Sequence, residues 1–138
     1  MRFVDTNVLV YAEQPGAGEK HRAASALVRD MWEQRDGAVS AQVLQELFVT
    51  ATRKMPSPYA PEVAKRIVSH YASWKVVPVD AALVLEAIDI QTESSLSYWD
   101  AAVVAAAVRA GATELLTEDL NDGQIIRGVR IRNPFAPT

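Results

Sequence analysis

Short apolar runs alternate with longer segments of helical periodicity along nearly the whole chain. Strands separated by helices in this way are typical of a parallel sheet that is covered on both faces. The pattern therefore predicts an α/β fold, a three-layer α/β/α sandwich with a short-stranded parallel central sheet. The predicted strands are 3–5, 38–39, 75–79, 114–117 and 129–131, and the predicted helices are 8–12, 19–34, 41–53, 63–71, 83–88 and 98–110.

Length and composition point to one soluble domain. The 138 residues, of which 49% are hydrophobic, suit a single domain that spans residues 1–138. The longest apolar run, 101–108, is far shorter than the ~20 residues of a membrane-spanning helix, and the amino terminus lacks the features of a signal peptide. We therefore expect a cytoplasmic protein with no membrane partner.

The chain has no cysteine and two histidines, His21 and His70. Disulfides, thiolate zinc sites and cysteine nucleophiles are thereby excluded, and metal chemistry must rest on oxygen ligands. The formal net charge of −3 argues against a module that binds nucleic acid mainly by neutralising phosphates. Several basic residues suit a rim around an acidic site, although solvated surface is the simpler interpretation of each one: Arg53, Lys54, Lys65, Arg66, Arg127, Arg130 and Arg132.

Two aspartates come directly after predicted strands. Asp5 ends the first apolar run, and Asp119 follows a later one. The carboxyl ends of parallel strands meet at one edge of a sheet, where open α/β folds place their ligands. Each aspartate also has a simpler interpretation: Asp5 as a helix cap, a role that Thr6 or Asn7 can equally fill, and Asp119 as a turn residue. Asp122 is the alternative to Asp119 as the acid from this part of the chain that reaches the site, and Asp119 is favoured because it is nearer the strand.

Two further acids belong to predicted helices. Glu46 lies in a polar line with Gln42 and Thr50 at i, i+4 spacing, for which a solvated glutamate is the default interpretation. Asp100 completes an S-x-x-D capping pattern that begins at Ser97, but the helix that follows is almost wholly apolar. A carboxylate beside the core needs compensation, and a bound cation is one form of it.

If these acids meet, they form a site for a divalent cation. Carboxylates a few ångström apart repel one another unless they are protonated or metal-bound. Oxygen ligation favours Mg²⁺ or Mn²⁺ over zinc, and the natural substrate of such an ion is a phosphate. A metal-bound water can attack phosphorus without a histidine or cysteine nucleophile. The four acids predicted to share this site are Asp5, Glu46, Asp100 and Asp119.

Four segments, in their order and spacing, resemble the PIN-domain family and specifically its VapC-type toxin ribonucleases. They are 4–9 (VDTNVL), 42–46 (QVLQE), 98–102 (YWDAA) and 116–120 (LTEDL). The resemblance covers nearly the whole chain. It implies a helix-covered parallel sheet, an acidic pocket for Mg²⁺ or Mn²⁺, metal-dependent cleavage of RNA, a cognate antitoxin protein that blocks the pocket, and a homodimer.

The same resemblance implies roles for individual residues. Asp5 and Asp100 would be the main metal ligands, Glu46 would orient water, and Asp119 would hold a second or weaker metal site. The supporting polar groups would be Thr6, Asn7, Thr117 and, with its contact to the metal left open, Asp122.

Two other functions fit part of the pattern. A haloacid-dehalogenase-like phosphatase would use Asp5 as its nucleophile, but it needs an acid/base aspartate two residues later, where Asn7 stands. A catalytically silent PIN-like protein-binding module, or a phospho-receiver domain, would keep the acidic pocket; a receiver also needs a lysine near the end of a late strand, and none follows Leu116. The leading prediction is an endoribonuclease that acts as the toxin of a type II toxin–antitoxin pair.

Overall fold

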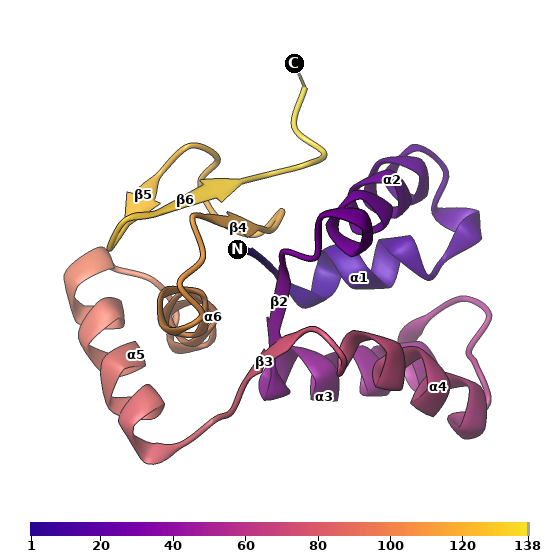
Figure 1. The fold of residues 1–138 in the computed structure, drawn as a ribbon, viewed down its shortest axis with the longest axis horizontal. Coiled ribbons are helices and arrows are strands. Elements are labelled where there is room, and N and C mark those ends of the chain that lie inside the picture. Colours follow the sequence, from indigo (N-terminus) through magenta and orange to yellow (C-terminus); the bar gives the residue numbers. More distant parts are fainter. Residues whose placement is uncertain (138) are drawn as a thin grey trace.

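Six strands form one sheet in residues 1–137, the part of the chain that the computed structural model describes (Figure 1). They are β1 Arg2–Val4, β2 Gly37–Ser40, β3 Lys75–Val77, β4 Glu114–Leu116, β5 Ile125–Ile126 and β6 Val129–Arg132. The strand order is β3-β2-β1-β4-β6-β5, so the first strand of the sequence lies inside the sheet. All neighbouring strands pair in parallel except β5, which is antiparallel to β6.

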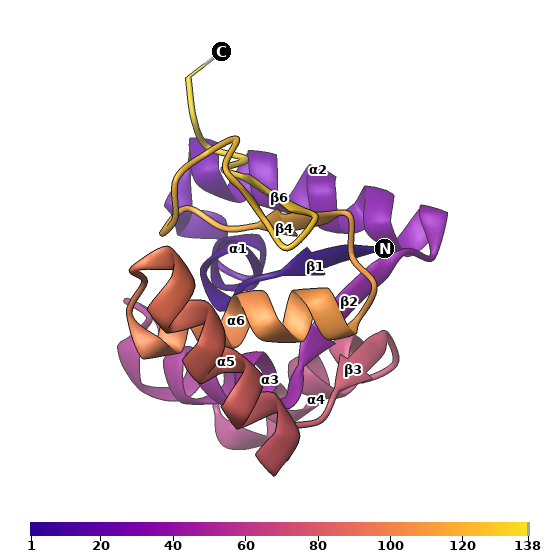
Figure 2. The same ribbon diagram turned by 90° about the vertical axis from the view of Figure 1, so that its left-hand side faces the viewer.

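Helices cover both faces of this sheet. They are α1 Thr6–Ala12, α2 Glu19–Gln34, α3 Ala41–Val49, α4 Pro61–Tyr71, α5 Ala81–Ser94 and α6 Tyr98–Arg109, with a 3-10 turn η1 at Pro15–Ala17 and a π-helical turn η2 at Thr50–Lys54. α5 and α6 lie on one face, and α1 and α2 lie across the other (Figures 1 and 2). This arrangement confirms the predicted three-layer α/β/α class.

The centre of the molecule is apolar because the inner strands are buried from both sides. Phe3 and Val4 of β1 and Leu115 and Leu116 of β4 are fully buried, as expected for a parallel sheet between helices. α6 packs against β2, β4 and β6, and the whole run Ala101–Ala107 is buried. Despite this apolar helix, none within residues 1–137 combines the length and hydropathy needed to cross a membrane.

The antiparallel strand β5 was not predicted, and the sheet is therefore mixed at one edge. Its two residues are too few to give a periodic signal. The two-residue loop between β5 and β6 holds Arg127 at φ 48° and Gly128 at φ 82°. Positive φ at both positions matches the tight hairpin turns that the twist of paired strands favours. At the opposite edge, β3 ends at Val77 instead of the predicted Val79, because Pro78 has no N–H to donate to a neighbouring strand.

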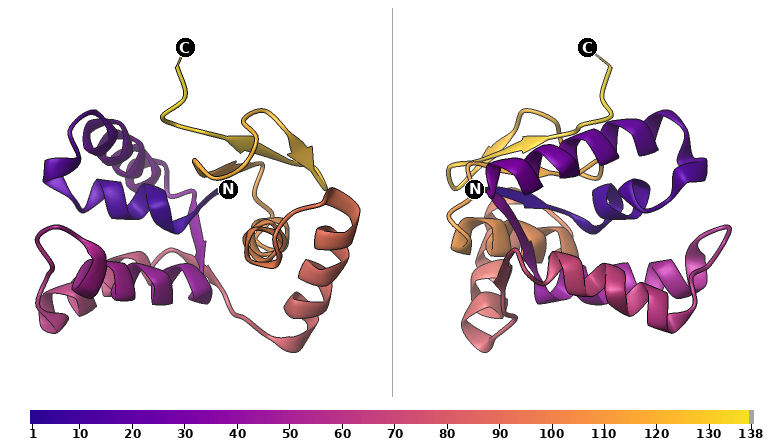
Figure 3. Two further views of the ribbon diagram at one scale, coloured as in Figure 1. Left: turned by 180° about the vertical axis from the view of Figure 1, so that it is seen from behind. Right: turned by 45° about the vertical axis from the view of Figure 1, so that its right-hand side comes forward.

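The helices that reach the site begin directly after strands, and their caps fix where they start. Serine is a favoured N-cap, and the position of Ser40 between the predicted strand 38–39 and the predicted helix 41–53 predicts that it caps α3. Its Oγ accepts the amide of Val43 at 3.2 Å, which confirms this. Of the three residues that could cap α1, Asp5 is the cap, and Thr6 and Asn7 lie inside the helix. α1 and α3 then run side by side from the carboxyl edge of the sheet (Figure 3).

The predicted helix 41–53 is also interrupted. α3 ends at Val49, and the chain continues as the π-helical turn η2 before it turns away at Met55. π-Helical turns are rare and occur frequently at functional sites. η2 turns out to form part of the site wall.

Candidate active site

Two neighbouring strands place Asp5 and Thr117 next to each other. Val4 of β1 pairs with Leu116 of β4, and the amide of Asp5 donates to the carbonyl of Leu116 at 3.0 Å. The hydroxyl of Thr117 then donates to Oδ2 of Asp5 at 2.8 Å, while Oδ1 of Asp5 accepts the amide of Thr6 at 2.8 Å. Both oxygens of this buried carboxylate are thus held by hydrogen bonds.

Burial makes Asp5 an unusually weak acid. The residue is 7% exposed. The pKa of its carboxyl is raised from 3.8 to about 6. Desolvation is the largest cause; the hydrogen bonds from Thr117 and Thr6 lower the pKa, and the negative charges of Asp119 and Glu46 raise it. Perturbed acids of this kind concentrate at functional sites. The two charges that act on Asp5 also show that three predicted site acids lie close to one another.

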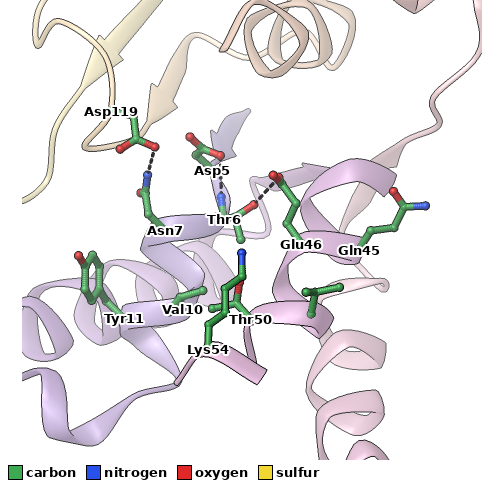
Figure 4. Close-up of a pocket in the computed structure, with 11 residues that line it drawn as sticks. Asp5, Thr6, Asn7, Val10, Tyr11, Gln45, Glu46, Thr50, Lys54 and Asp119 are labelled. Carbon is green, nitrogen blue, oxygen red and sulfur yellow. Dashed lines mark hydrogen bonds between the residues drawn. The ribbon is translucent and has the colours of Figure 1, made fainter. Parts of the chain in front are cut away.

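Consecutive residues of α1 hold the two other carboxylates (Figure 4). The hydroxyl of Thr6 donates to Oε1 of Glu46 at 2.9 Å, and Nδ2 of Asn7 donates to Oδ2 of Asp119 at 2.9 Å. Glu46 comes from α3 and Asp119 from the loop after β4, so α1 links these two acids to Asp5, which caps α1. Glu46 is exposed, but its side chain is directed to the site and not simply to solvent.

These groups surround a cavity of about 490 Å³. Its walls come from the end of β1, from α1, from α3 with η2, and from the loop after β4. The lining residues are Asp5, Thr6, Asn7, Val10, Tyr11, Gln45, Glu46, Val49, Thr50, Lys54 and Asp119 (Figure 4).

The structure does not bring every predicted acid to this cavity. Asp100 lies in the first turn of α6, where Oγ of Ser97 accepts its amide at 3.1 Å, and it is half-buried and does not line the cavity. Asp122 does not line the cavity either, and its Oδ1 accepts the amide of Asn133 at 2.8 Å. Between the two aspartates that follow β4, the one that reaches the cavity is Asp119.

Lys54 was assigned from the sequence to a basic rim, or to ordinary solvated surface. Its side chain instead points into the cavity from η2, below the acids (Figure 4). No sequence signal marks the π-helical turn itself. The signal that could have found Lys54 is the i, i+4 line of Gln42, Glu46 and Thr50, whose next position is 54. Gln45 and Tyr11 also line the cavity without having been predicted.

The donor atoms at the cavity suit a hard divalent cation. They are carboxylate, hydroxyl and amide oxygens, and Oδ1 of Asn7 is buried without a hydrogen-bond partner within residues 1–137. No three acidic or histidine side chains in that part of the chain converge closely enough to hold a metal ion as they stand. Hydrogen bonds from α1 hold one oxygen each of Glu46 and Asp119. Mg²⁺ keeps several waters and takes only one or two carboxylates directly, so it does not need three convergent acids.

Fold and site together define an α/β protein with an acidic cavity at the carboxyl edge of a parallel sheet. The model of the PIN domain family matches residues 2–123, and the chain belongs to this family. The family resemblance that the four sequence segments indicated is therefore confirmed.

Several solved structures share the fold. A toxin–antitoxin complex from Klebsiella pneumoniae has a TM-score of 0.72 at 20% identity, with 98% of each chain covered. VapC20 of Mycobacterium tuberculosis, described as a sarcin–ricin-loop-cleaving toxin, has a TM-score of 0.62 at 20% identity, covering 83% of this chain and 87% of that one. DNA-bound VapBC from Salmonella typhimurium has a TM-score of 0.67 at 18% identity, covering 96% and 97%. No match was found among curated protein sequences.

Proposed function

We propose that the protein is a Mg²⁺- or Mn²⁺-dependent endoribonuclease that acts as the toxin of a type II toxin–antitoxin pair. The observation that carries the proposal is the convergence of Asp5, Glu46 and Asp119 on one cavity, each held by a hydrogen bond from a neighbouring hydroxyl or amide. Membership of the PIN-domain family supports it. The likeness of the fold to proteins described as a sarcin–ricin-loop-cleaving toxin and as toxin–antitoxin complexes supports it further.

Each residue has a distinct task in this proposal. Asp5 and Asp119, which follow the neighbouring strands β1 and β4, would hold the cation, and Asp100 is the third proposed ligand. When bound, the cation supplies positive charge for the phosphate and lowers the pKa of an attacking water. Glu46 holds that water, because Thr6 occupies its Oε1 and leaves Oε2 available. Thr117 keeps Asp5 oriented and favours its ionised form.

The test is cleavage of structured RNAs, including a sarcin–ricin-loop oligonucleotide, by purified protein freed of its antitoxin. We expect cleavage with Mg²⁺ or Mn²⁺, none with a chelator, and loss of at least ~100-fold in rate in Asp5→Asn. Asp89→Asn is the matched control, because Asp89 is an exposed carboxylate far from the cavity lining. Cleavage that persists in chelator, or in Asp5→Asn at the wild-type rate, would overturn the proposal.

The partners form a second part of the proposal. We place the toxin in the cytoplasm as a homodimer that binds a cognate antitoxin. Co-purification with the product of a neighbouring short gene, followed by light scattering of the free toxin and of the complex, tests both statements. A free toxin that is monomeric at micromolar concentration would refute the homodimer. A complex with full ribonuclease activity would refute the proposal that the antitoxin blocks the active site.

A catalytically silent binding module is the second candidate. The observation in its favour is that no three acids within residues 1–137 converge as a finished metal site. Calorimetric titration with Mn²⁺ distinguishes the two: the ribonuclease binds the ion through Asp5, and the silent module does not. The phosphatase alternative is disfavoured because Asn7, where that chemistry needs an acid, uses its amide to hold Asp119.

A further inference from the structure

We propose that Lys54 is a phosphate-contacting residue, whose Nζ binds a backbone phosphate of the RNA inside the acidic cavity. This inference rests on the proposed ribonuclease function and adds a substrate contact to it. The contact is made by this chain's own side chain, on the wall opposite the loop that carries Asp119 (Figure 4).

Lys54 is the last residue of the π-helical turn. α3 ends at Val49, and η2 continues to Lys54 before the chain becomes extended at Met55. Thr50 and Lys54 both line the cavity, whereas Arg53, the residue just before Lys54, does not. Of these two adjacent basic residues, Lys54 is the one that lines the cavity.

Lys54 is the one basic side chain among the eleven residues that line the cavity. Within residues 1–137 it forms no ion pair and no side-chain hydrogen bond, in contrast to Lys20, which binds Glu118 at 2.9 Å, and Lys75, which donates to the carbonyl of Ala110 at 2.9 Å. Its ammonium is thus exposed and has its three donors available for a ligand.

An anionic ligand of this cavity needs such a group. The carboxylates of Asp5, Glu46 and Asp119 repel an RNA phosphate, and a cation held among them offsets the repulsion only on their side. A lysine across the cavity provides a second positive charge on the far side of the phosphate. Lysine is a common phosphate ligand because its ammonium is a compact point charge on a flexible stem.

Another explanation for Lys54 is electrostatic support of the carboxylates in the absence of RNA. The two roles differ in what they change. If Lys54 only supports the carboxylates, its substitution changes the thermal stability of the RNA-free protein and leaves the salt dependence of RNA binding unchanged. If Lys54 contacts a phosphate, its substitution weakens RNA binding, lowers the salt dependence of that binding, and leaves the thermal stability of the RNA-free protein unchanged.

The variants that test the contact are Lys54→Met and Lys54→Arg, with Arg53→Met as the matched control. We expect Lys54→Met to lower kcat/KM for RNA by roughly 10- to 100-fold and to reduce the salt dependence of RNA binding by about one phosphate contact. Lys54→Arg should regain most of the activity, because the positive charge is kept. Arg53→Met removes the same charge from the same turn and should change kcat/KM by less than about 2-fold.

A direct readout uses the small number of lysines. The chain has four, Lys20, Lys54, Lys65 and Lys75, so ¹³C-methylated lysines give a spectrum that single substitutions can assign. A ten-nucleotide single-stranded RNA is added with Mg²⁺ to Glu46→Gln, which keeps the proposed metal ligands and removes the proposed water contact, so that the RNA is not cleaved. It should shift the Lys54 signal and leave that of the exposed Lys65 in place. RNA binding without a shift of the Lys54 signal would overturn the inference.

The outcomes separate this inference from the proposed function. Metal-dependent cleavage by the wild type together with undiminished cleavage by Lys54→Met refutes the lysine contact alone. Absence of both cleavage and RNA binding in the wild type refutes the ribonuclease and, with it, the contact. A fall in thermal stability of RNA-free Lys54→Met, with unchanged salt dependence of RNA binding, assigns Lys54 to support of the acids and also refutes the contact.

Discussion

The hydroxyl of Thr117 donates to Oδ2 of Asp5 at 2.8 Å, although 112 residues separate the two in the sequence. Thr117 is fully buried, and its oxygen also accepts the amide of Asp119 at 3.1 Å and Nδ2 of Asn7 at 3.3 Å. The side chain of Thr117 therefore contacts the buried Asp5, the backbone of the exposed Asp119, and the amide of Asn7 that holds the Asp119 carboxylate. Changes at Thr117 should affect the acidity and the geometry of the site together.

Thr117→Val keeps the shape of the side chain and removes this connection. We expect the pKa of Asp5 to rise above its value of about 6, because the hydrogen bond from Thr117 lowers it. The free energy of unfolding should fall by about 1 to 3 kcal/mol, the cost of leaving a buried polar group without its partner. Carboxyl ¹³C NMR titration of metal-free protein measures the first effect and chemical denaturation the second. Thr113→Val, at the other end of β4, is the control, and an unmoved Asp5 titration would contradict the prediction.

Asp5 should destabilise the metal-free protein at neutral pH. Its pKa of about 6 in the folded protein lies above the ordinary value of 3.8, so between these pH values the native state binds more protons than the unfolded state. Stability therefore falls as pH rises through this window. Asp5→Asn keeps a good helix cap and should raise the free energy of unfolding by about 2 to 3 kcal/mol at pH 7, with no gain below pH 4. Urea denaturation at the two pH values checks this, with the exposed Asp89→Asn as control; an equal gain at both would argue against an ionised buried carboxylate.

Added Mg²⁺ or Mn²⁺ should offset the destabilisation that the ionised Asp5 carboxylate causes at neutral pH. We expect the ion to raise Tm at pH 7.5, by an amount equivalent to ~2.7 kcal/mol when its concentration is about 100 times Kd, and to lose this effect in Asp5→Asn. The rise should weaken as pH falls below about 6, since protonation of Asp5 removes a ligand. Asp100→Asn should lose the rise and Asp122→Asn should keep it, because the carboxylate of Asp122 is engaged by the amide of Asn133. A full rise in Asp100→Asn would remove Asp100 from the ligand set.

Gly37 allows the close packing of β2 against Trp74. A Cβ at this position would lie 2.7 Å from the indole ring, nearer than carbon atoms approach in proteins. Gly37→Ala should therefore displace Trp74 and lower the free energy of unfolding by about 1 to 3 kcal/mol. Tryptophan fluorescence during denaturation reports both effects. Gly16→Ala, where nothing lies within 4 Å of the added carbon, should change neither, and equal behaviour of the two variants would show that Trp74 yields without cost.

Local patterns were sufficient to predict the parts of the fold that repeat a simple rule. α2 runs from Glu19 to Gln34 as its apolar spacing predicts, and Ser40 caps α3 as its position after a strand predicts. The rule that parallel strands end at one edge also placed Asp5 and Asp119 together. These predictions succeeded because strand period, helix period and capping depend on residues within one turn or one strand.

Features set by packing between distant segments could not be derived in this way. The two residues of β5 become a strand only because β6 folds back beside them. Glu46 lies on the polar line expected of a solvated helix face, and only the approach of α1 turns that line into a site wall. The π-helical turn that interrupts the predicted helix 41–53 is not signalled by any residue type. Asp100 was predicted to share the site because it begins an almost wholly apolar helix, and the structure leaves it outside the cavity lining.

The π-helical turn Thr50–Lys54 holds one residue more than a turn of regular α-helix, because the amide of Met55 donates to the carbonyl of Thr50, five residues earlier, at 3.1 Å. Deletion of one residue from 51–53 should therefore let α3 continue as a regular α-helix. The lysine would then lie three residues after Thr50, still on the same helix face, because residues three and four apart are neighbours on a helix. A shortened chain of this kind separates two properties of the cavity wall: the charge that Lys54 brings and the wider turn that carries it.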